Sequence, residues 1–285
     1  MEYGRHTAVW VMVALLGVAV IFVWQTAIGN TEDGILSVTF LDVGQGDATL
    51  VEAPNGNQIL IDGGKGRIVL RALSKELSFF DRTIDVVLAT HPDMDHIGGL
   101  PDVLKRYTVH TLFEPGVHDD GADYQALVAA VQTSNTATKL ARAGSVISID
   151  EDVHLHILFP DRDVSDVEAN TGSVVARLVY GDTSFLFTGD APVAIERHLI
   201  AVWGRGLKSD VLKLGHHGSR TSTSEEFLGF VGPAYAVASA SCDNTYGHPH
   251  TDITERLARF NIPLLDTCTN GTVRFESDGA IVVPK

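Results

Sequence analysis

Four side chains that can bind metal ions lie within six residues, directly after a short apolar segment. The segment reads VVLAT (residues 86–90), and it is followed by His91, Asp93, Asp95 and His96. Imidazole and carboxylate groups together suit Zn, Mn or Fe, and a turn between a strand and a helix lets them point toward two ions. The chain is therefore expected to fold so that a buried strand ends at a metal site.

Other side chains that can bind metals also follow apolar segments. Asp190 comes directly after the segment FLFTG, although a single aspartate in such a position is often only part of a turn. Six of the 12 histidines fall in three loops that end apolar segments: His91, His96, His216, His217, His248 and His250. Ligands that gather at neighbouring strand ends form a preformed site, and we expect these loops to meet.

After residue 30 the chain alternates short apolar runs with Gly, Asp and Asn. These patterns predict strands at Ile35–Leu41, Ala48–Glu52, Gln58–Ile61, Val86–Ala89, Thr111–Phe113, His154–Leu158, Val174–Tyr180, Ser184–Phe187, Asp210–Leu214, Tyr235–Ala240 and Thr272–Glu276. They predict helices at Ile68–Leu77, Ala122–Thr133, Val193–Trp203, Ser224–Val231 and Asp252–Phe260, the last capped by Thr251 or Asp252. This order indicates packed sheets covered by helices, and the pattern alone does not distinguish them from a doubly wound α/β fold. With no internal repeat and no long linker, residues 31–285 are expected to form one domain.

The N-terminal segment Thr7–Ile28 contains 22 residues and no charge. About 20 apolar residues span a bilayer as a helix, so residues 1–30 are expected to form a short cytoplasmic flank and a membrane anchor. Arg5 lies before the segment and Glu32 and Asp33 lie after it, which favours an extracytoplasmic position for the domain that follows. A cleaved signal peptide is the alternative, and a buried soluble helix fits less well.

Charge and cysteine content narrow the classes of function. The formal net charge is −15, which argues against a protein that holds nucleic acid by a broad basic face. It does not exclude phosphate chemistry at a metal ion, because the ion supplies positive charge. The two cysteines, Cys242 and Cys268, are expected to be unpaired buried thiols, with one disulfide as the alternative outside the cytoplasm.

The motifs together resemble those of the metallo-β-lactamase superfamily. They are HxDxDHxGG, TGD and GHHGS, with the earlier segments FLDVGQGDA (residues 40–48) and LIDGG (residues 60–64). Within that superfamily the chain is similar, from Ser37 to Glu276, to the hydrolase domain of ComEC-type DNA-uptake proteins and their stand-alone relatives. The resemblance implies an α/β fold, a four-layer αββα sandwich with a two-metal site along one edge of its sheets.

The resemblance also implies roles for individual residues. His91 and Asp93 would bind one metal ion, Asp95 and His96 the other, and Asp190 would bridge the two. His216 is expected to be the late histidine ligand, with His217 or His248 contacting the substrate, although either late histidine could be the ligand. The catalytic set is then Asp95, His217 and His248. Asp47 and Asp62 lie in loops that line the site in this family, and Asp62 is expected to orient a ligand histidine.

Three departures from the family pattern bear on cofactor and partners. Asp93 stands where many members have histidine, which makes Mn more plausible beside Zn because a carboxylate is a harder ligand. The usual mid-chain histidine ligand is absent, and Asn170–Ser173 occupy that stretch. ComEC-type proteins also carry a membrane channel for which this chain has no room. We therefore do not expect this chain to transport DNA alone, and a separate DNA-uptake channel is a candidate partner.

The sequence favours a metal-dependent phosphodiesterase, a nuclease (DNase) in which two divalent ions, Zn or Mn, activate a hydroxide. Its partners would be DNA or another phosphodiester, and the membrane through the N-terminal helix. Lys213 and Arg220 are candidates for holding the phosphodiester. Hydrolysis of a small or cell-envelope phosphodiester, such as a phosphocholine ester, is the alternative that the acidic charge favours. A non-catalytic binding module is the third hypothesis.

Overall fold

The computed structural model describes residues 6, 10–18, 20 and 34–285. Within this described part of the chain, no helix has both the length and the hydropathy needed to cross a membrane. The expected anchor Thr7–Ile28 lies partly outside the described residues, and the expected domain boundary after residue 30 lies wholly outside them. Both therefore stay predictions.

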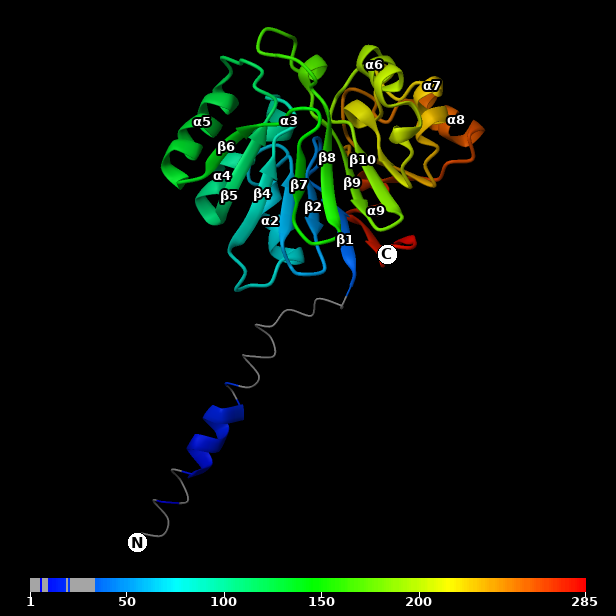
Figure 1. Ribbon diagram of the computed structural model, residues 1–285. Helices are drawn as coiled ribbons and strands as arrows, with labels where there is room; N and C mark the ends of the chain where they lie inside the picture. The colour runs from blue at the N-terminus through cyan, green and yellow to red at the C-terminus, as the bar shows by residue number, and fades with distance from the viewer. Residues whose placement is uncertain (1–5, 7–9, 19, 21–33) are drawn as a thin grey trace.

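Two mixed β-sheets form the centre of the molecule (Figure 1). The first has the strand order β15-β14-β1-β2-β3-β4-β5-β6, with bounds Val282–Pro284, Val273–Ser277, Leu36–Phe40, Thr49–Glu52, Gln58–Ile61, Thr83–Leu88, Thr108–Glu114 and Ala137–Leu140. The second has the order β13-β12-β11-β10-β9-β8-β7, with bounds Leu264–Asp266, Tyr235–Ala238, Val211–Lys213, Thr183–Phe187, Val175–Tyr180, Val153–Phe159 and Val146–Ser148. Strands β3 to β6 are parallel, and so are β10 to β13.

Helices cover the outer face of each sheet. The α-helices of residues 34–285 are α2 (Ile68–Glu76), α3 (Met94–Ile97), α4 (Leu100–Arg106), α5 (Ala122–Ser134), α6 (Val193–Trp203), α7 (Glu225–Val231), α8 (Thr251–Arg259) and α9 (Thr267–Asn270). Buried side chains of α2, α4 and α5 pack on the first sheet, and those of α6, α7 and α8 pack on the second. A third apolar cluster lies between the two sheets. The expected four-layer αββα sandwich is confirmed.

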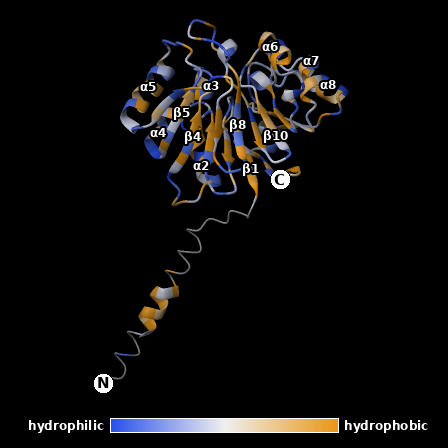
Figure 2. Ribbon diagram, in the orientation of Figure 1, coloured by the Kyte–Doolittle hydropathy of each residue, from blue (hydrophilic) through white to orange (hydrophobic). Residues whose placement is uncertain are grey.

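Strand β3 shows why the central strands are apolar on both faces of the sheet. Ile59 and Ile61 point into the cluster between the sheets, whereas Leu60 packs against the helices. Alternate side chains of a strand face opposite sides of the sheet, and both sides are covered here, so the three residues after Gln58 are all apolar. Figure 2 shows the same distribution, with hydrophobic strands at the centre.

All eleven predicted strands and all five predicted helices are present, with some shifted ends. The elements that the patterns missed are β6, β7, β13, β15, α3, α4 and α9. Strand β6 is an exposed edge strand, so it has no alternation of apolar and polar residues to detect. The predicted cap of α8 is wrong: His250 occupies the N-cap position, and its side chain makes no capping hydrogen bond.

The two cysteines are joined, which corrects the expectation of two free thiols. Cys242 follows β12, and Cys268 lies in α9. Parallel pairing of β12 with β13 brings the two segments together, and the Ala240 amide donates a hydrogen bond to the Thr267 hydroxyl. This proximity depends on the sheet topology, which a separation of 26 residues does not reveal.

Candidate metal centre

The loops named in the sequence analysis meet at one edge of the two sheets. His91–His96 follow β4 in the first sheet, Asp190 follows β10, and His216 and His217 follow β11 in the second. Backbone hydrogen bonds join these loops: Asp47 N–H to Asp95 O (3.1 Å), His216 N–H to Gly189 O (3.1 Å) and Gly63 N–H to His96 O (2.7 Å). Each sheet therefore supplies part of one site.

Three buried histidines direct Nε2 atoms toward the carboxylate of Asp190. The distances to its nearer oxygen are 3.3 Å from His96, 3.7 Å from His217 and 3.9 Å from His91. All four side chains are buried. The three Nε2 atoms and Asp190 Oδ1 have no hydrogen-bond partner among the described residues.

Unpartnered buried donor and acceptor atoms that converge in this way are what a metal ion requires. Asp47, His96, Asp190 and His217 each offer a ligand atom, and these atoms lie within 4.8 Å of one another. Because burying polar atoms without partners is costly, and imidazole and carboxylate are common metal ligands, these residues fit a divalent cation. The structure contains a buried His/Asp metal-binding site.

The other ring nitrogen of each inward histidine is held in place. His96 Nδ1 lies 2.8 Å from Asp62 Oδ2, and His217 Nδ1 lies 3.1 Å from Asp47 Oδ1. The Thr90 hydroxyl lies 3.0 Å from His91 Nδ1 and donates to Asp62. These contacts fix the rings with Nε2 facing the centre, as partners of ligand histidines do in metal sites.

Of the two adjacent late histidines, His217 is the buried one. Its side chain is 1% exposed, and its Nε2 lies 3.2 Å from Asp95 Oδ2. The His216 side chain is 28% exposed, with Nε2 3.6 Å from Asp190 and Nδ1 3.0 Å from the Thr221 hydroxyl. Both residues have positive φ, 50° and 55°, so the backbone turns sharply and the two rings take different directions. The predicted ligand His216 therefore lies at the rim, and His217, predicted to contact substrate, lies in the centre.

The remaining predicted residues lie around this centre. Asp93 is half-exposed, with Oδ2 3.6 Å from His91 Nε2. His248 is one ring further out, 6.2 Å from the His217 ring and 5.6 Å from the His216 ring. Lys213 is buried and pairs with Asp47 at 2.9 Å, so it lies beside the centre with its charge already partnered.

Carboxylates and imidazoles at this site shift one another's pKa values. Burial alone would raise the pKa of Asp190, but the imidazoles of His96 and His217 hold it well below its usual range. Burial alone would lower the pKa of His217, but Asp190 and Asp47 raise it to about 9. Burial likewise opposes ionisation of Asp95, but the imidazoles of His217, with Nε2 3.2 Å away, and of His96 lower its pKa to about 2. The centre therefore carries ionised carboxylates that stabilise positive charge.

Two positioning residues were not found from the sequence. Thr90 contacts both Asp62 and His91, and Ser173 Oγ accepts a hydrogen bond from the Asp190 amide at 3.2 Å. Thr90 precedes His91, and Ser173 ends the stretch Asn170–Ser173 that was noted only for its missing histidine. Hydroxyl residues are common near turns, so their presence alone does not indicate a role.

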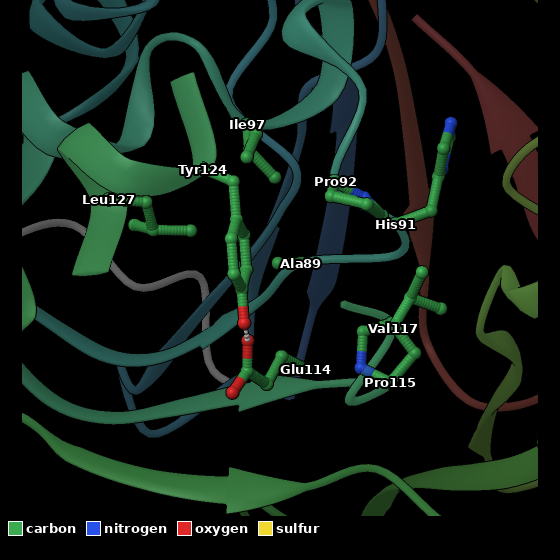
Figure 3. Close-up of a pocket in the computed structure, with 9 residues that line it drawn as sticks. All are labelled: Ala89, His91, Pro92, Ile97, Glu114, Pro115, Val117, Tyr124 and Leu127. Atoms are coloured by element: carbon green, nitrogen blue, oxygen red, sulfur yellow. Dashed lines mark hydrogen bonds between the residues drawn. The ribbon is translucent and has the colours of Figure 1, made fainter. Parts of the chain in front are cut away.

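A small cavity lies beside the ligand loop (Figure 3). The Tyr124 hydroxyl donates to Glu114 there at 3.3 Å, and the His91 side chain extends away from that pair. The cavity has about 10 Å³, which suffices for roughly one water molecule and not for a substrate.

Gly46 is required by the close approach of two motif loops. Its φ is +124°, and a Cβ there would lie 2.1 Å from the Asp95 carbonyl oxygen. We expect Gly46→Ala to displace the Asp95 backbone and lower hydrolytic activity at least about tenfold, since ångström-scale shifts of catalytic groups cost this much or more. Gly44→Ala is the matched control, because Gly44 also has positive φ but nothing within 4 Å. Equal activity of the two variants in a steady-state assay would contradict this account.

The Cys242–Cys268 disulfide lies at the base of the loop that carries His248. We expect the double variant Cys242→Ser/Cys268→Ser to lower the free energy of unfolding by about 3 kcal/mol, because a cross-link restricts the unfolded chain. Urea denaturation without reductant, compared with the parent protein, measures the difference. An unchanged midpoint and slope would show that the cross-link does not stabilise the fold.

Comparison with known proteins agrees with this architecture. The sequence model of the metallo-beta-lactamase superfamily matches residues 41–241. ComE operon protein 3 of Bacillus subtilis is 33% identical over 257 residues, which are 84% of this chain and 32% of that protein. Recombination protein 2 of Haemophilus influenzae is 34% identical over 241 residues, 83% of this chain and 28% of that protein. This chain thus spans about a third of the length of these relatives.

A solved structure shows the same fold at low sequence identity. The metallo-beta-lactamase fold protein YhfI from Bacillus subtilis has a TM-score of 0.59 and 13% identity, covering 86% of this chain and 100% of that one. Together with the buried His/Asp site, the sequence match places the chain in a family: it belongs to the metallo-β-lactamase superfamily and has the metal site of a metal-dependent hydrolase.

Proposed function

We propose that this protein is a metal-dependent phosphodiesterase that acts on DNA. The observation that carries the proposal is the set of unpartnered atoms, three Nε2 atoms and Asp190 Oδ1, that converge in a buried centre. The names of its relatives add a nucleic-acid context: one is called a recombination protein, and another is competence protein ComA of Neisseria gonorrhoeae. A binding module that had lost its metal would leave these buried atoms without partners, which is costly.

The proposed ligands form two sets that share Asp190. His91 and Asp93 would hold one ion, and Asp95, His96 and His217 the other. The burial of His217 and its contact with Asp95 favour it over His216 as the late ligand. The carboxylate of Asp93 supports Mn beside Zn as the metal.

A pair of divalent ions, when bound, supplies a nucleophile at neutral pH and neutralises phosphoryl charge. The chain's own rim groups would then bind and orient the ester. His216 and His248 lie next to the centre on its open side and can donate hydrogen bonds to phosphoryl oxygens. Arg220 is exposed, 3.8 Å from Asp252, and can reach a second phosphate.

A small or cell-envelope phosphodiester is the second candidate substrate. The net charge of −15 favours it, because long nucleic acids are repelled by an acidic surface. A short single-stranded segment that reaches only the rim of the site would avoid most of that repulsion.

We also propose that the protein is membrane-anchored with its hydrolase domain outside the cytoplasm, beside a separate DNA-uptake channel. The disulfide supports an oxidising compartment, since such bonds persist there. Susceptibility of the domain to protease added to intact spheroplasts tests this orientation, and full protection would overturn it.

The proposed activity is tested with the 285-residue chain loaded with Mn or Zn. Single-stranded DNA, double-stranded DNA and bis(p-nitrophenyl) phosphate are assayed in parallel. Cleavage of DNA supports the nuclease, whereas turnover of the small diester with intact DNA supports the second candidate. No turnover of any of the three would overturn phosphodiester hydrolysis.

A further inference from the structure

Tyr246 is an exposed aromatic residue at the mouth of the metal centre. Its side chain is 65% exposed, although one face of its ring is stacked on His248 at 5.6 Å and 21°. His248 is in turn 6.2 Å from the His217 ring, with an interplanar angle of 32°. A row of roughly parallel rings therefore leads from the buried centre to the surface, and Tyr246 is its outermost member.

The loop that carries Tyr246 is held firmly in place. Asn244 donates to the carbonyls of Ser241 and His248 and accepts from the His248 amide at 2.8 Å. The disulfide at Cys242 fixes the start of this loop. The ring of Tyr246 is thus presented in a defined position, and stacking on a rigid aromatic costs little conformational entropy.

The groups around Tyr246 suit a phosphate-bearing aromatic ligand. His250 N–H donates to Gly218 O at 3.0 Å, so the loop lies beside the turn that carries His216 and leads to Arg220. The His250 ring is 5.0 Å from the His248 ring. The loop also carries the exposed Asp243, and Asp252 in the first turn of α8 pairs with Arg220.

This arrangement fits a nucleobase better than a choline group. A quaternary ammonium is recognised by several aromatic rings that surround it. Tyr246 instead stacks on the single imidazole of His248, and a guanidinium lies on the adjoining turn. Bases of every kind stack on single aromatic side chains, and cations nearby bind the linked phosphates.

We propose that Tyr246 is the platform on which the nucleobase next to the scissile phosphate stacks, so that the substrate is a nucleotidyl phosphodiester. This inference rests on the proposed phosphodiesterase function and narrows it. Tyr246 would act on specificity: it binds the base and takes no part in the bond-breaking step.

Three chromogenic esters with the same leaving group distinguish a nucleobase from a choline group as the ligand of Tyr246. They are thymidine 5′-(p-nitrophenyl phosphate), methyl p-nitrophenyl phosphate and p-nitrophenyl phosphorylcholine. We expect Tyr246→Ala to lower kcat/KM about tenfold for the thymidine ester, which is about 1.4 kcal/mol, and to leave the methyl ester unchanged. Tyr246→Phe should retain the parent values, since stacking does not need the hydroxyl. Phe79→Ala is the control, an aromatic residue 75% exposed just before β4, at the opposite sheet edge.

Two outcomes of this assay would overturn the platform while leaving the phosphodiesterase intact. An equal loss for the thymidine and methyl esters would mean that Tyr246 only positions His248. A loss confined to the phosphorylcholine ester would assign the ring to a different ligand.

Binding gives a readout that does not depend on turnover. Fluorescence anisotropy of a labelled oligothymidylate, at low salt, is measured with the parent chain and both Tyr246 variants. We expect a several-fold weaker affinity for Tyr246→Ala and an unchanged one for Tyr246→Phe. If no ester is hydrolysed, the phosphodiesterase proposal fails, and the platform is then judged by this binding alone. Equal affinity of all three proteins, or no binding by the parent, would overturn it.

Discussion

Asp190→Ala is expected to abolish hydrolysis, lowering turnover of bis(p-nitrophenyl) phosphate at least about a thousandfold. Removing one group that stabilises a transition state typically costs about 10²–10³, and Asp190 would in addition bind both ions. Its carboxylate lies within 3.9 Å of nitrogens from four histidines, His91, His96, His216 and His217. Among the described residues, no other carboxylate of the site contacts as many. Turnover and metal content per chain are measured together.

Metal content distinguishes a carboxylate that binds both ions from one that only supports the fold. We expect the variant to retain well below the metal content of the parent, because the carboxylate shared by both ligand sets is gone. Asp182→Ala is the matched control, an exposed aspartate in the turn between β9 and β10. If Asp190→Ala stays folded by circular dichroism and keeps full activity, Asp190 does not bridge the ions.

Phe275→Ala is expected to lower the free energy of unfolding by about 4 kcal/mol. Phe275 is fully buried in β14, and its ring contacts Phe40 at 6.1 Å, Phe185 at 6.1 Å and Tyr235 at 5.5 Å. Phe185 and Tyr235 belong to the second sheet, so the substitution opens a cavity where the two sheets meet. Truncating a buried phenylalanine typically costs about 3–5 kcal/mol through lost transfer energy and the cavity left behind.

Urea denaturation of Phe275→Ala and Phe230→Ala checks this estimate. Phe230 lies in α7 and is partly exposed, so its truncation should cost below about 1.5 kcal/mol. A similar loss for both variants would mean that the contact between the sheets contributes little beyond general burial.

Sequence patterns identified the elements that burial makes largely apolar. Gln58–Ile61 and Val193–Trp203 were predicted with their observed bounds, because burial imposes a clear apolar pattern on both. Helix α4 was missed because it begins directly after Gly98 and Gly99, residues typical of turns. The two glycines are there for another reason: a Cβ at Gly99 would lie 2.2 Å from the Gly63 carbonyl oxygen.

The residues around the metal centre could be predicted better than their arrangement. Strand ends and motif spacing indicated Asp190 and the His91–His96 cluster, which do lie together. Which of His216 and His217 faces the centre could not be derived from the sequence. Both residues have positive φ, so their side chains do not point where their spacing in a regular element would place them. The burial of Lys213 depends on its pairing with Asp47, a contact between residues far apart in the chain.

The division of the metal centre between the two sheets has a consequence for how the protein unfolds. Asp47, Asp62 and the His91–His96 cluster belong to the N-terminal half, and Asp190 and His217 to the C-terminal half. An ion bound by both halves adds its binding free energy to their association, because neither half alone offers the full set of ligands. Occupancy of the site should therefore couple the two halves into one cooperative unit, and a chelator should loosen them from each other before either loses its own helices and strands.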